Sequence, residues 1–151
     1  MLAGCALPFD DASPPSDDVV LDGRTPAGSG WRLLVHADPD DGRLCTTFVV
    51  ETGIVGSCDY DGERLGVRWG RRDAAAPVWW VSGAVDDEVV EVEVRTGRAV
   101  TRLPTVPSPD PVAAGRRFFI LVDDGALPEE LAVRGLDAEG DLLAEEPVAL
   151  P

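Results

Sequence analysis

Short apolar runs separated by glycine-containing turns are the feature that most constrains how this chain can fold. Five dipeptides place a glycine where the apolar pattern breaks: Asp41-Gly42, Asp61-Gly62, Thr96-Gly97, Asp124-Gly125 and Glu139-Gly140. Glycine adopts positive φ at no steric cost, so such pairs reverse the chain between neighbouring strands. The longest helical candidate, Pro128–Val133, is barely one turn. The pattern therefore predicts an all-β domain.

The segments between these turns are the expected strands. The ten predicted strands are Trp31–Ala37, Arg43–Val50, Ile54–Tyr60, Arg64–Trp69, Val78–Val85, Glu88–Arg95, Arg98–Leu103, Arg116–Val122, Leu131–Asp137 and Leu142–Pro147. In Glu88–Arg95 valines alternate with charged residues, which predicts one buried face and one solvated acidic face. Arg116–Val122 is apolar on both faces from Phe118 onward, which predicts a central strand with Phe118 and Phe119 in the core.

About eight to ten short strands over roughly 120 residues fit two packed sheets better than one open sheet. We therefore expect an immunoglobulin-like, two-sheet antiparallel sandwich at residues 31–151. Between Leu103 and Ala114 lie four prolines, which predict a rigid loop suited to carry the chain from one sheet to the other. From Val85 onward, the alternating hairpin, the proline-rich loop, the Arg-Phe-Phe strand and the final hairpin resemble small exported β-sandwich domains of high-GC bacteria. That resemblance implies a fold and an address but no activity.

The charge of the chain excludes several classes of function. Acidic residues outnumber basic ones 28 to 13, which gives a formal net charge of -15. A field of that sign repels phosphate backbones, so nucleic acid is not an expected partner. Every basic residue is an arginine, so the chain supplies no P-loop lysine, Schiff-base lysine or lysine general base. No cofactor is expected.

The start of the chain predicts where in the cell the protein is located. Leu2-Ala3-Gly4-Cys5 resembles the lipobox of bacterial lipoproteins. The resemblance implies cleavage before Cys5, a diacylglyceryl group on its thiol and anchoring to the cell membrane through lipid alone. A complete signal also needs a basic segment and an apolar segment upstream, whereas only Met1 to Gly4 precede the cysteine here, so the resemblance covers the lipobox alone. No run of 18 apolar residues is present to span a membrane.

Residues 1–30 have the composition expected of a tether that follows a lipid anchor. The stretch after Cys5 is rich in proline, aspartate and glycine, a composition that buries little surface. Such a segment serves as a spacer between a lipid anchor and a folded domain. The alternative is an ordinary disordered N-terminus with a chance cysteine.

The two other cysteines predict a disulfide if the chain is exported. Arg43–Val50 and Gly53–Tyr60 flank a two-residue turn, and pairing Val50 with Gly53 makes every pair of opposing residue numbers sum to 103. Cys45 and Cys58 satisfy that sum, so this register places them directly opposite. The alternative is two buried free thiols in a reducing compartment.

Metal binding is weakly indicated. The spacing of the cysteines and of the single histidine does not match structural zinc sites. Calcium prefers clustered oxygen ligands, and two turns concentrate acidic residues: Asp38, Asp40 and Asp41, and Asp59, Asp61 and Glu63. Neither turn matches the EF-hand spacing, and ordinary Asp-Gly turns are the favoured interpretation.

Catalytic residues are not indicated by the sequence. His36 is the only histidine, and no serine lies in a nucleophile elbow. A solvated histidine at a strand end is the favoured interpretation of His36. Paired carboxylates are abundant at predicted turns, where they are simply solvated.

Tryptophans next to arginines give the best indication of a binding surface. The residues concerned are Arg68, Trp69, Arg71, Arg72, Trp79 and Trp80. Adjacent strand residues face opposite sides, so we expect one of Trp79 and Trp80 in the core and the other open to solvent. An exposed tryptophan beside arginines can stack on a sugar or anchor a protein partner. Core filling with surface ion pairs is the competing interpretation.

Together these features predict a lipid-anchored extracytoplasmic β-sandwich that is not an enzyme and binds a protein or glycan of the cell envelope. One alternative is an envelope hydrolase, or its accessory subunit, that uses surface carboxylates. Another alternative is a cytosolic acidic interaction domain with free thiols at Cys45 and Cys58 and an unmodified Cys5.

Overall fold

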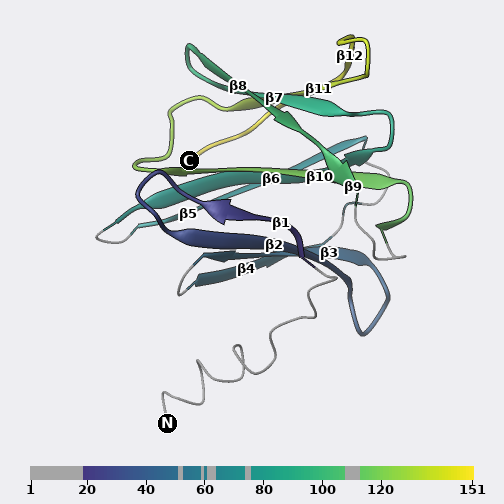
Figure 1. Cartoon of the computed structure of the whole chain (residues 1–151), viewed down its shortest axis with the longest axis horizontal. Coiled ribbons are helices and arrows are strands. Elements are labelled where there is room, and N and C mark those ends of the chain that lie inside the picture. Colours follow the sequence, from purple (N-terminus) through teal and green to yellow (C-terminus); the bar gives the residue numbers. More distant parts are fainter. Residues whose placement is uncertain (1–18, 51–52, 59, 61–63, 74–75, 108–112) are drawn as a thin grey trace.

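The computed structural model describes residues 19–50, 53–58, 60, 64–73, 76–107 and 113–151 (Figure 1). These residues form twelve strands and no α-helix. The strands are β1 (Val19–Arg24), β2 (Gly30–Ala37), β3 (Leu44–Val50), β4 (Gly53–Ser57), β5 (Leu65–Arg72), β6 (Val78–Asp86), β7 (Glu91–Thr96), β8 (Ala99–Pro104), β9 (Val106–Pro107), β10 (Arg116–Asp124), β11 (Ala132–Leu136) and β12 (Leu142–Pro147). The described part of the chain has no helix with the length and apolarity needed to cross a membrane.

The strands form three antiparallel sheets of four strands each. The N-terminal sheet has the order β1-β2-β3-β4, the middle sheet β5-β6-β10-β9, and the C-terminal sheet β12-β11-β7-β8. Figure 1 shows them as three stacked layers, with the N-terminal and C-terminal sheets on opposite sides of the middle sheet. The prediction of two sheets is therefore corrected to three. All ten predicted strands overlap observed ones, and β1 and β9 are additional.

The middle sheet is buried on both faces. Along β6 the side chains alternate between two clusters: Trp80 packs with the N-terminal sheet and Trp79 packs with the C-terminal sheet. Phe118 and Phe119 of β10 divide in the same way, and both are fully buried. A strand covered on both sides is apolar at successive positions, which is the pattern that predicted a central strand at Arg116–Val122.

The two apolar clusters define two cores. The N-terminal core lies between the N-terminal and middle sheets, where Phe48 of β3 stacks on Trp80 with ring centroids 4.5 Å apart. The C-terminal core lies between the middle and C-terminal sheets and is rich in valine, including Val92 and Val94 of β7. The predicted alternation of Glu88–Arg95 is confirmed for Val92 and Val94, which are buried in the core, and for Arg95, which is exposed. The prediction that the acidic face is solvated is wrong at Glu93, which is 5% exposed.

The folded domain begins earlier than predicted. β1 lies inside residues 1–30, the range expected to be a tether, and pairs with β2 from Val19 to Arg24. Val20 and Leu21 pack against the N-terminal core. The proline-rich and acidic composition on either side of Val19–Leu21 hid this short apolar run.

Turn positions follow the glycines. Gly42, Gly97, Gly125 and Gly140 all have positive φ, between 63° and 98°. Gly62 lies outside the described residues. The proline-rich segment after β8 does carry the chain between sheets, since β8 belongs to the C-terminal sheet and β10 to the middle sheet.

Candidate functional site

A disulfide joins Cys45 and Cys58 in the register that the sequence predicts. β3 pairs with β4 from Val50 opposite Gly53 to Thr46 opposite Ser57, so opposing residue numbers sum to 103. The next pair outward is Cys45 and Cys58, which form a disulfide with their Cα atoms 4.2 Å apart. Leu44 and Phe48 of β3 point into the N-terminal core. Because strand side chains alternate, Cys45 points to the opposite, outer face of the N-terminal sheet.

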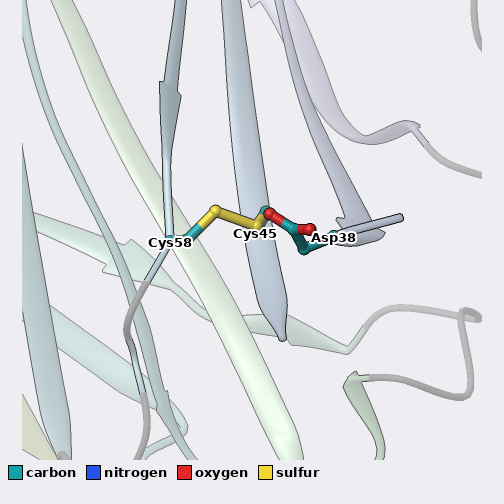
Figure 2. Close-up of side chains that lie close together, drawn as sticks. All are labelled: Asp38, Cys45 and Cys58. Carbon is teal, nitrogen blue, oxygen red and sulfur yellow. A yellow bond between two sulfur atoms is a disulfide. The ribbon is translucent and has the colours of Figure 1, made fainter. Parts of the chain in front are cut away.

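An acidic residue lies next to this disulfide (Figure 2). A carboxylate oxygen of Asp38 and the two sulfur atoms all lie within 4.8 Å of one another. The sequence spacing did not reveal this group, because Asp38 follows β2 while the cysteines lie on β3 and just beyond β4. While the disulfide is intact, neither sulfur is a thiolate, the form that binds metals. The group is therefore not a metal site in the oxidised protein.

The turn after β2 uses its carboxylates locally. Oδ1 of Asp38 accepts hydrogen bonds from the backbone N–H groups of Asp40 and Asp41, at 2.8 and 3.4 Å. Asp41 accepts one from the N–H of Arg43 at 3.0 Å and pairs with the guanidinium of the same residue. These bonds are those of an ordinary Asp-Gly turn. Of the other calcium candidates, Asp59, Asp61 and Glu63 lie outside the described residues, as does Cys5.

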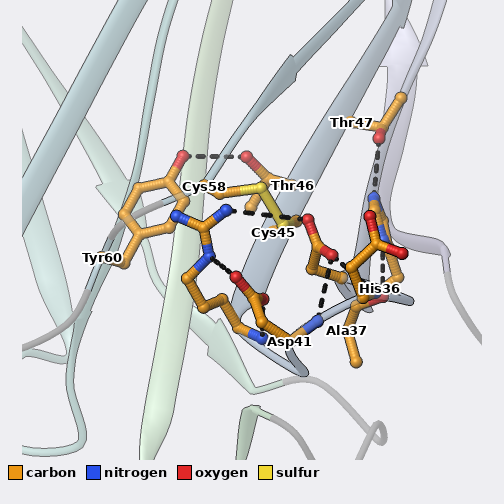
Figure 3. Close-up of a disulfide and its surroundings, with 11 residues drawn as sticks. His36, Ala37, Asp41, Cys45, Thr46, Thr47, Cys58 and Tyr60 are labelled. Carbon is orange, nitrogen blue, oxygen red and sulfur yellow. Dashed lines mark hydrogen bonds and ion pairs between the residues drawn. A yellow bond between two sulfur atoms is a disulfide. The ribbon is translucent and has the colours of Figure 1, made fainter.

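His36 lies beside the disulfide on the same face (Figure 3). β2 and β3 pair His36 directly opposite Cys45. Its Nε2 is 2.9 Å from the hydroxyl of Thr47, and its Nδ1 is 3.3 Å from the carbonyl oxygen of Ala37. Both ring nitrogens therefore have structural partners within the N-terminal sheet. His36 therefore lies at a strand end, as interpreted, but its side chain is half-buried rather than fully solvated.

Tyr60, which follows the disulfide in the chain, packs into the N-terminal core (Figure 3). Its side chain is fully buried, and its hydroxyl lies 2.8 Å from the hydroxyl of Thr46. The guanidinium of Arg68, on β5, lies 4.6 Å from the centroid of the Tyr60 ring. This cation–π contact links the N-terminal sheet region to the edge of the middle sheet.

The prediction that one of Trp79 and Trp80 is open to solvent is wrong, because both lie on β6 in the middle sheet. Trp79 and Trp80 are 5% and 4% exposed, so neither is open to solvent. The alternation on β6 was predicted correctly, but each face of this strand is covered by a different sheet. Core filling, the competing interpretation, holds for both residues. Trp80 also lies against β5, where a Cβ on Gly70 would come within 2.3 Å of its ring, closer than real Cβ contacts.

The arginines of the same prediction divide between two faces of β5. Arg68 and Arg72 pair opposite Ser82 and Val78 of β6, whereas Arg71 pairs opposite Trp79. Arg71 is exposed and forms an ion pair with Asp73 at 3.1 Å. Trp69 is partly buried and packs against the C-terminal core. Of the six predicted surface residues, Arg71 is therefore exposed, Arg68, Trp69 and Arg72 are half-buried, and Trp69 and Arg71 share one face of the edge strand β5.

A row of alternating charges crosses the C-terminal sheet, and sequence reasoning missed it. Direct register places Glu145 of β12, Arg134 of β11, Glu93 of β7 and Arg102 of β8 side by side. We call these four residues the charge ladder. Arg102 donates to Glu93 at 2.7 Å, and Arg134 lies 3.4 Å from both Glu93 and Glu145. Opposite charges directly across strands are favourable, so the ladder joins all four strands.

Glu93 is the centre of the ladder. Its side chain is only 7% exposed although it points away from the C-terminal core, because arginine side chains cover it. Burial by itself raises the pKa of its carboxyl group, but hydrogen bonds from Arg102 and the charges of Arg102, Arg95 and Arg134 outweigh burial, so the pKa is lowered. Glu93 therefore stays ionised and serves as a structural counter-ion. The alternation of Glu88–Arg95 predicted the face on which it lies but not its neighbours.

No family model, no curated protein and no solved structure matches this chain.

Proposed function

We propose that the chain is a lipid-anchored extracytoplasmic binding module, without catalytic activity, that recognises a protein or glycan at the cell envelope. The observation that carries this proposal is the Cys45–Cys58 disulfide. Disulfides form and persist in oxidising compartments such as the bacterial cell exterior and periplasm. The lipobox-like Leu2-Ala3-Gly4-Cys5 supports the same address from an independent part of the sequence.

The surroundings of the titratable residues support binding over catalysis. Among the described residues, the ring nitrogens of His36 lie next to the hydroxyl of Thr47 and the carbonyl oxygen of Ala37, and no carboxylate orients the imidazole as in a Ser-His-Asp triad. The pKa of Glu93 is lowered, the direction opposite to that of a general acid. On the proposed binding surface, Trp69 supplies an aromatic face and Arg71 a positive charge, which together suit a sugar ring or an acidic side chain of a partner.

We further infer that β5 to β12 form an immunoglobulin-like sandwich to which the N-terminal sheet is added as a third layer. If β5 is taken as strand A, the middle sheet has the order A-B-E-D and the C-terminal sheet the order G-F-C-C′. These are the orders of immunoglobulin-like sandwiches. The sandwich contains no cysteine, because the three cysteines, Cys5, Cys45 and Cys58, all precede β5. Backbone contacts between β6 and β10 and between β7 and β11 in an NMR structure test this order.

Intact mass of the membrane-bound protein tests the address. The full reading frame, with any coding sequence upstream of Met1, is expressed in a related bacterial host, and the membrane fraction is measured with and without reductant. We expect a chain that starts at Cys5, carries acyl groups and gains about 2 Da on reduction of its one disulfide. A soluble, unacylated product with reduced thiols would contradict the proposal. The matched Cys5→Ser variant should lose the acyl groups and keep the disulfide.

A hydrolase screen tests the absence of catalysis. We expect no turnover of ester, peptide or glycoside substrates above the rate of a His36→Ala variant. Turnover that the His36→Ala substitution abolishes would show that the chain is an enzyme and would refute the binding-module proposal.

A further inference from the structure

β4 is an unguarded edge strand. Among the strands that the structure describes, β1, β4, β5, β8, β9 and β12 lie at sheet edges. Charged residues or prolines on an edge discourage pairing with another chain. Five of these edges carry such residues, for example Arg102 and Pro104 on β8 and Glu145 and Pro147 on β12. β4 has the sequence Gly-Ile-Val-Gly-Ser and carries neither.

The same strand exposes apolar side chains on both of its faces. Ile54 and Val55 are 51% and 46% exposed, and they are adjacent, so they point to opposite sides of the N-terminal sheet. The other large exposed apolar residues of the described chain, Val100 and Leu142, lie on the guarded edges β8 and β12. An accessible strand edge with apolar residues on both faces is a template for a further strand.

We propose that this edge pairs with β4 of a second copy of the chain, antiparallel and about a two-fold axis at Val55. The two N-terminal sheets then continue into one sheet across the dimer. Two-fold dimers are the commonest homo-oligomers, and each contact in them occurs twice. The inference goes beyond the proposed function and does not depend on the lipid anchor.

The sequence of β4 is complementary to itself in this register. A two-fold axis perpendicular to the sheet pairs residues whose numbers have an even sum, and a sum of 110 is the one that pairs all five residues of Gly53–Ser57. Val55 then lies opposite Val55 of the second copy, and Ile54 lies opposite Gly56. The large side chain meets the residue without one, so neither face is overcrowded. A sum of 108 or 112 pairs three residues at most.

Charge sets the conditions under which this dimer forms. β4 contains no charged residue, so no like charges oppose each other across the new pair. The Cδ atom of Arg72 lies 3.9 Å from the Cβ position of Gly53, which places a positive charge near the edge of an acidic protein. The net charge of -15 on each copy still opposes association at long range. Salt screens that repulsion, so we expect dimerisation to strengthen as ionic strength rises.

Sedimentation equilibrium tests the dimer. The full chain carries Cys5→Ser so that no disulfide forms between copies, and a concentration series is measured at low and at high salt. We expect the average mass to rise from the 16.0 kDa of one chain toward twice that value, at lower protein concentration in high salt. Val55→Lys should keep the mass at one chain throughout. The matched Val100→Lys, at a valine of similar exposure on β8, should dimerise like the parent.

Cross-linking tests the register. Val55→Cys in the Cys5→Ser background places two thiols opposite each other at the axis, with Cβ atoms about 4.5 to 5.5 Å apart. Ile54→Cys places them on a diagonal, farther apart. With the oxidant diamide, which takes up the two thiol hydrogens, we expect the Val55→Cys dimer to form at least several-fold faster.

Three results would overturn the proposal: a single-chain mass at every concentration and salt level, loss of the dimer in Val100→Lys as well as in Val55→Lys, or equal cross-linking of the two cysteine variants. A chain that stays monomeric until a separate extended peptide binds β4 would assign the edge to a different partner and would also refute self-pairing. None of these results bears on lipidation, so they leave the proposed function untouched.

Discussion

The two outer sheets do the same structural task by different chemistry. Each covers one face of the middle sheet and builds one core with it. The N-terminal sheet is held across β3 and β4 by a covalent bond, the Cys45–Cys58 disulfide. The C-terminal sheet is held across all four strands by the charge ladder. The first link depends on redox conditions and the second on pH, so the two sheets respond to different changes in their surroundings.

The two links also differ in how many residues and strand pairings each one requires. A disulfide needs two residues in one hairpin, and a hairpin is a local structure. The ladder needs four residues spread from Glu93 to Glu145, and three strand pairings must all have the correct register. The N-terminal link is therefore visible in the sequence, whereas the C-terminal link appears only when the strands are assembled.

The largest effects should come from the middle sheet, where one phenylalanine serves each core. Phe118→Ala and Phe119→Ala should each lower the free energy of unfolding by about 3 to 5 kcal/mol, because each leaves a cavity in a filled core. Hydrogen exchange distinguishes them. Phe118→Ala should speed exchange in β2 and β3, and Phe119→Ala in β7 and β11. The same exchange pattern in both variants would contradict two separate cores.

Removal of the disulfide should have the next largest effect and should act on one sheet. Replacing Cys45 and Cys58 together by alanine should lower the free energy of unfolding by about 3 kcal/mol, since the bond closes a short loop in the unfolded chain. Urea denaturation measures the loss, and Cys5→Ser is the matched control with no expected change. Faster exchange in β7 and β11 than in β3 would show that the bond does not act locally.

A substitution at Gly70 should weaken the N-terminal core by a smaller amount. Gly70→Ala places a Cβ 2.3 Å from the ring of Trp80, so the ring must move out of its position beside Phe48. We expect a loss of about 1 to 3 kcal/mol, as for other overpacked sites. Gly30→Ala, where a Cβ would meet nothing within 4 Å, is the control and should change stability by less than about 0.5 kcal/mol. Equal losses in the two variants, measured by thermal unfolding, would show that the contact with Trp80 has no special role.

The smallest effect should come from the charge ladder and should depend on pH. The pKa of Glu93 lies below the ordinary value of 4.5 in the folded chain, so its contribution to stability is complete above that value and is lost as pH falls through the lowered pKa. Glu93→Gln should therefore lower the melting temperature near neutral pH, by less than the disulfide variant does. It should also reduce the fall in stability below pH 4.5.

Melting temperatures of Glu93→Gln and of Glu146→Gln, measured from pH 7 to pH 3, check this expectation. Glu146 is exposed on β12 and forms no ion pair with any residue that the structure describes. If the melting temperatures of Glu93→Gln and Glu146→Gln depend on pH in the same way, Glu93 does not act as a structural counter-ion.

The parts of the fold that the sequence predicted correctly are those set by residues close together in the chain. The positive φ at Gly42 and Gly97 follows from turn chemistry between neighbouring residues. The register of β3 and β4 follows from a turn of known length, and it located the disulfide. β1 escaped prediction because its apolar run is short and lies between proline-rich and acidic segments.

The candidate binding surface shows the limit of the same reasoning. The period of a strand predicted that Trp79 and Trp80 face opposite sides, but not which residue faces which side or what covers each side. A third sheet covers the second face, so both rings are buried. What stays accessible of that surface lies on the edge strand β5, where Arg71 is exposed and Arg68, Trp69 and Arg72 are half-buried.

By itself, the sequence determined the approximate positions of ten of the twelve strands, most of the turns and which cysteines meet, because these depend on residues near one another along the chain. Only the tertiary structure decided that there are three layers, that the middle one is covered twice, that four distant charges form one ladder and that β4 is left as an open edge. These features depend on the order in which strands pair, and that order is set by the burial of apolar surface between segments far apart in the sequence.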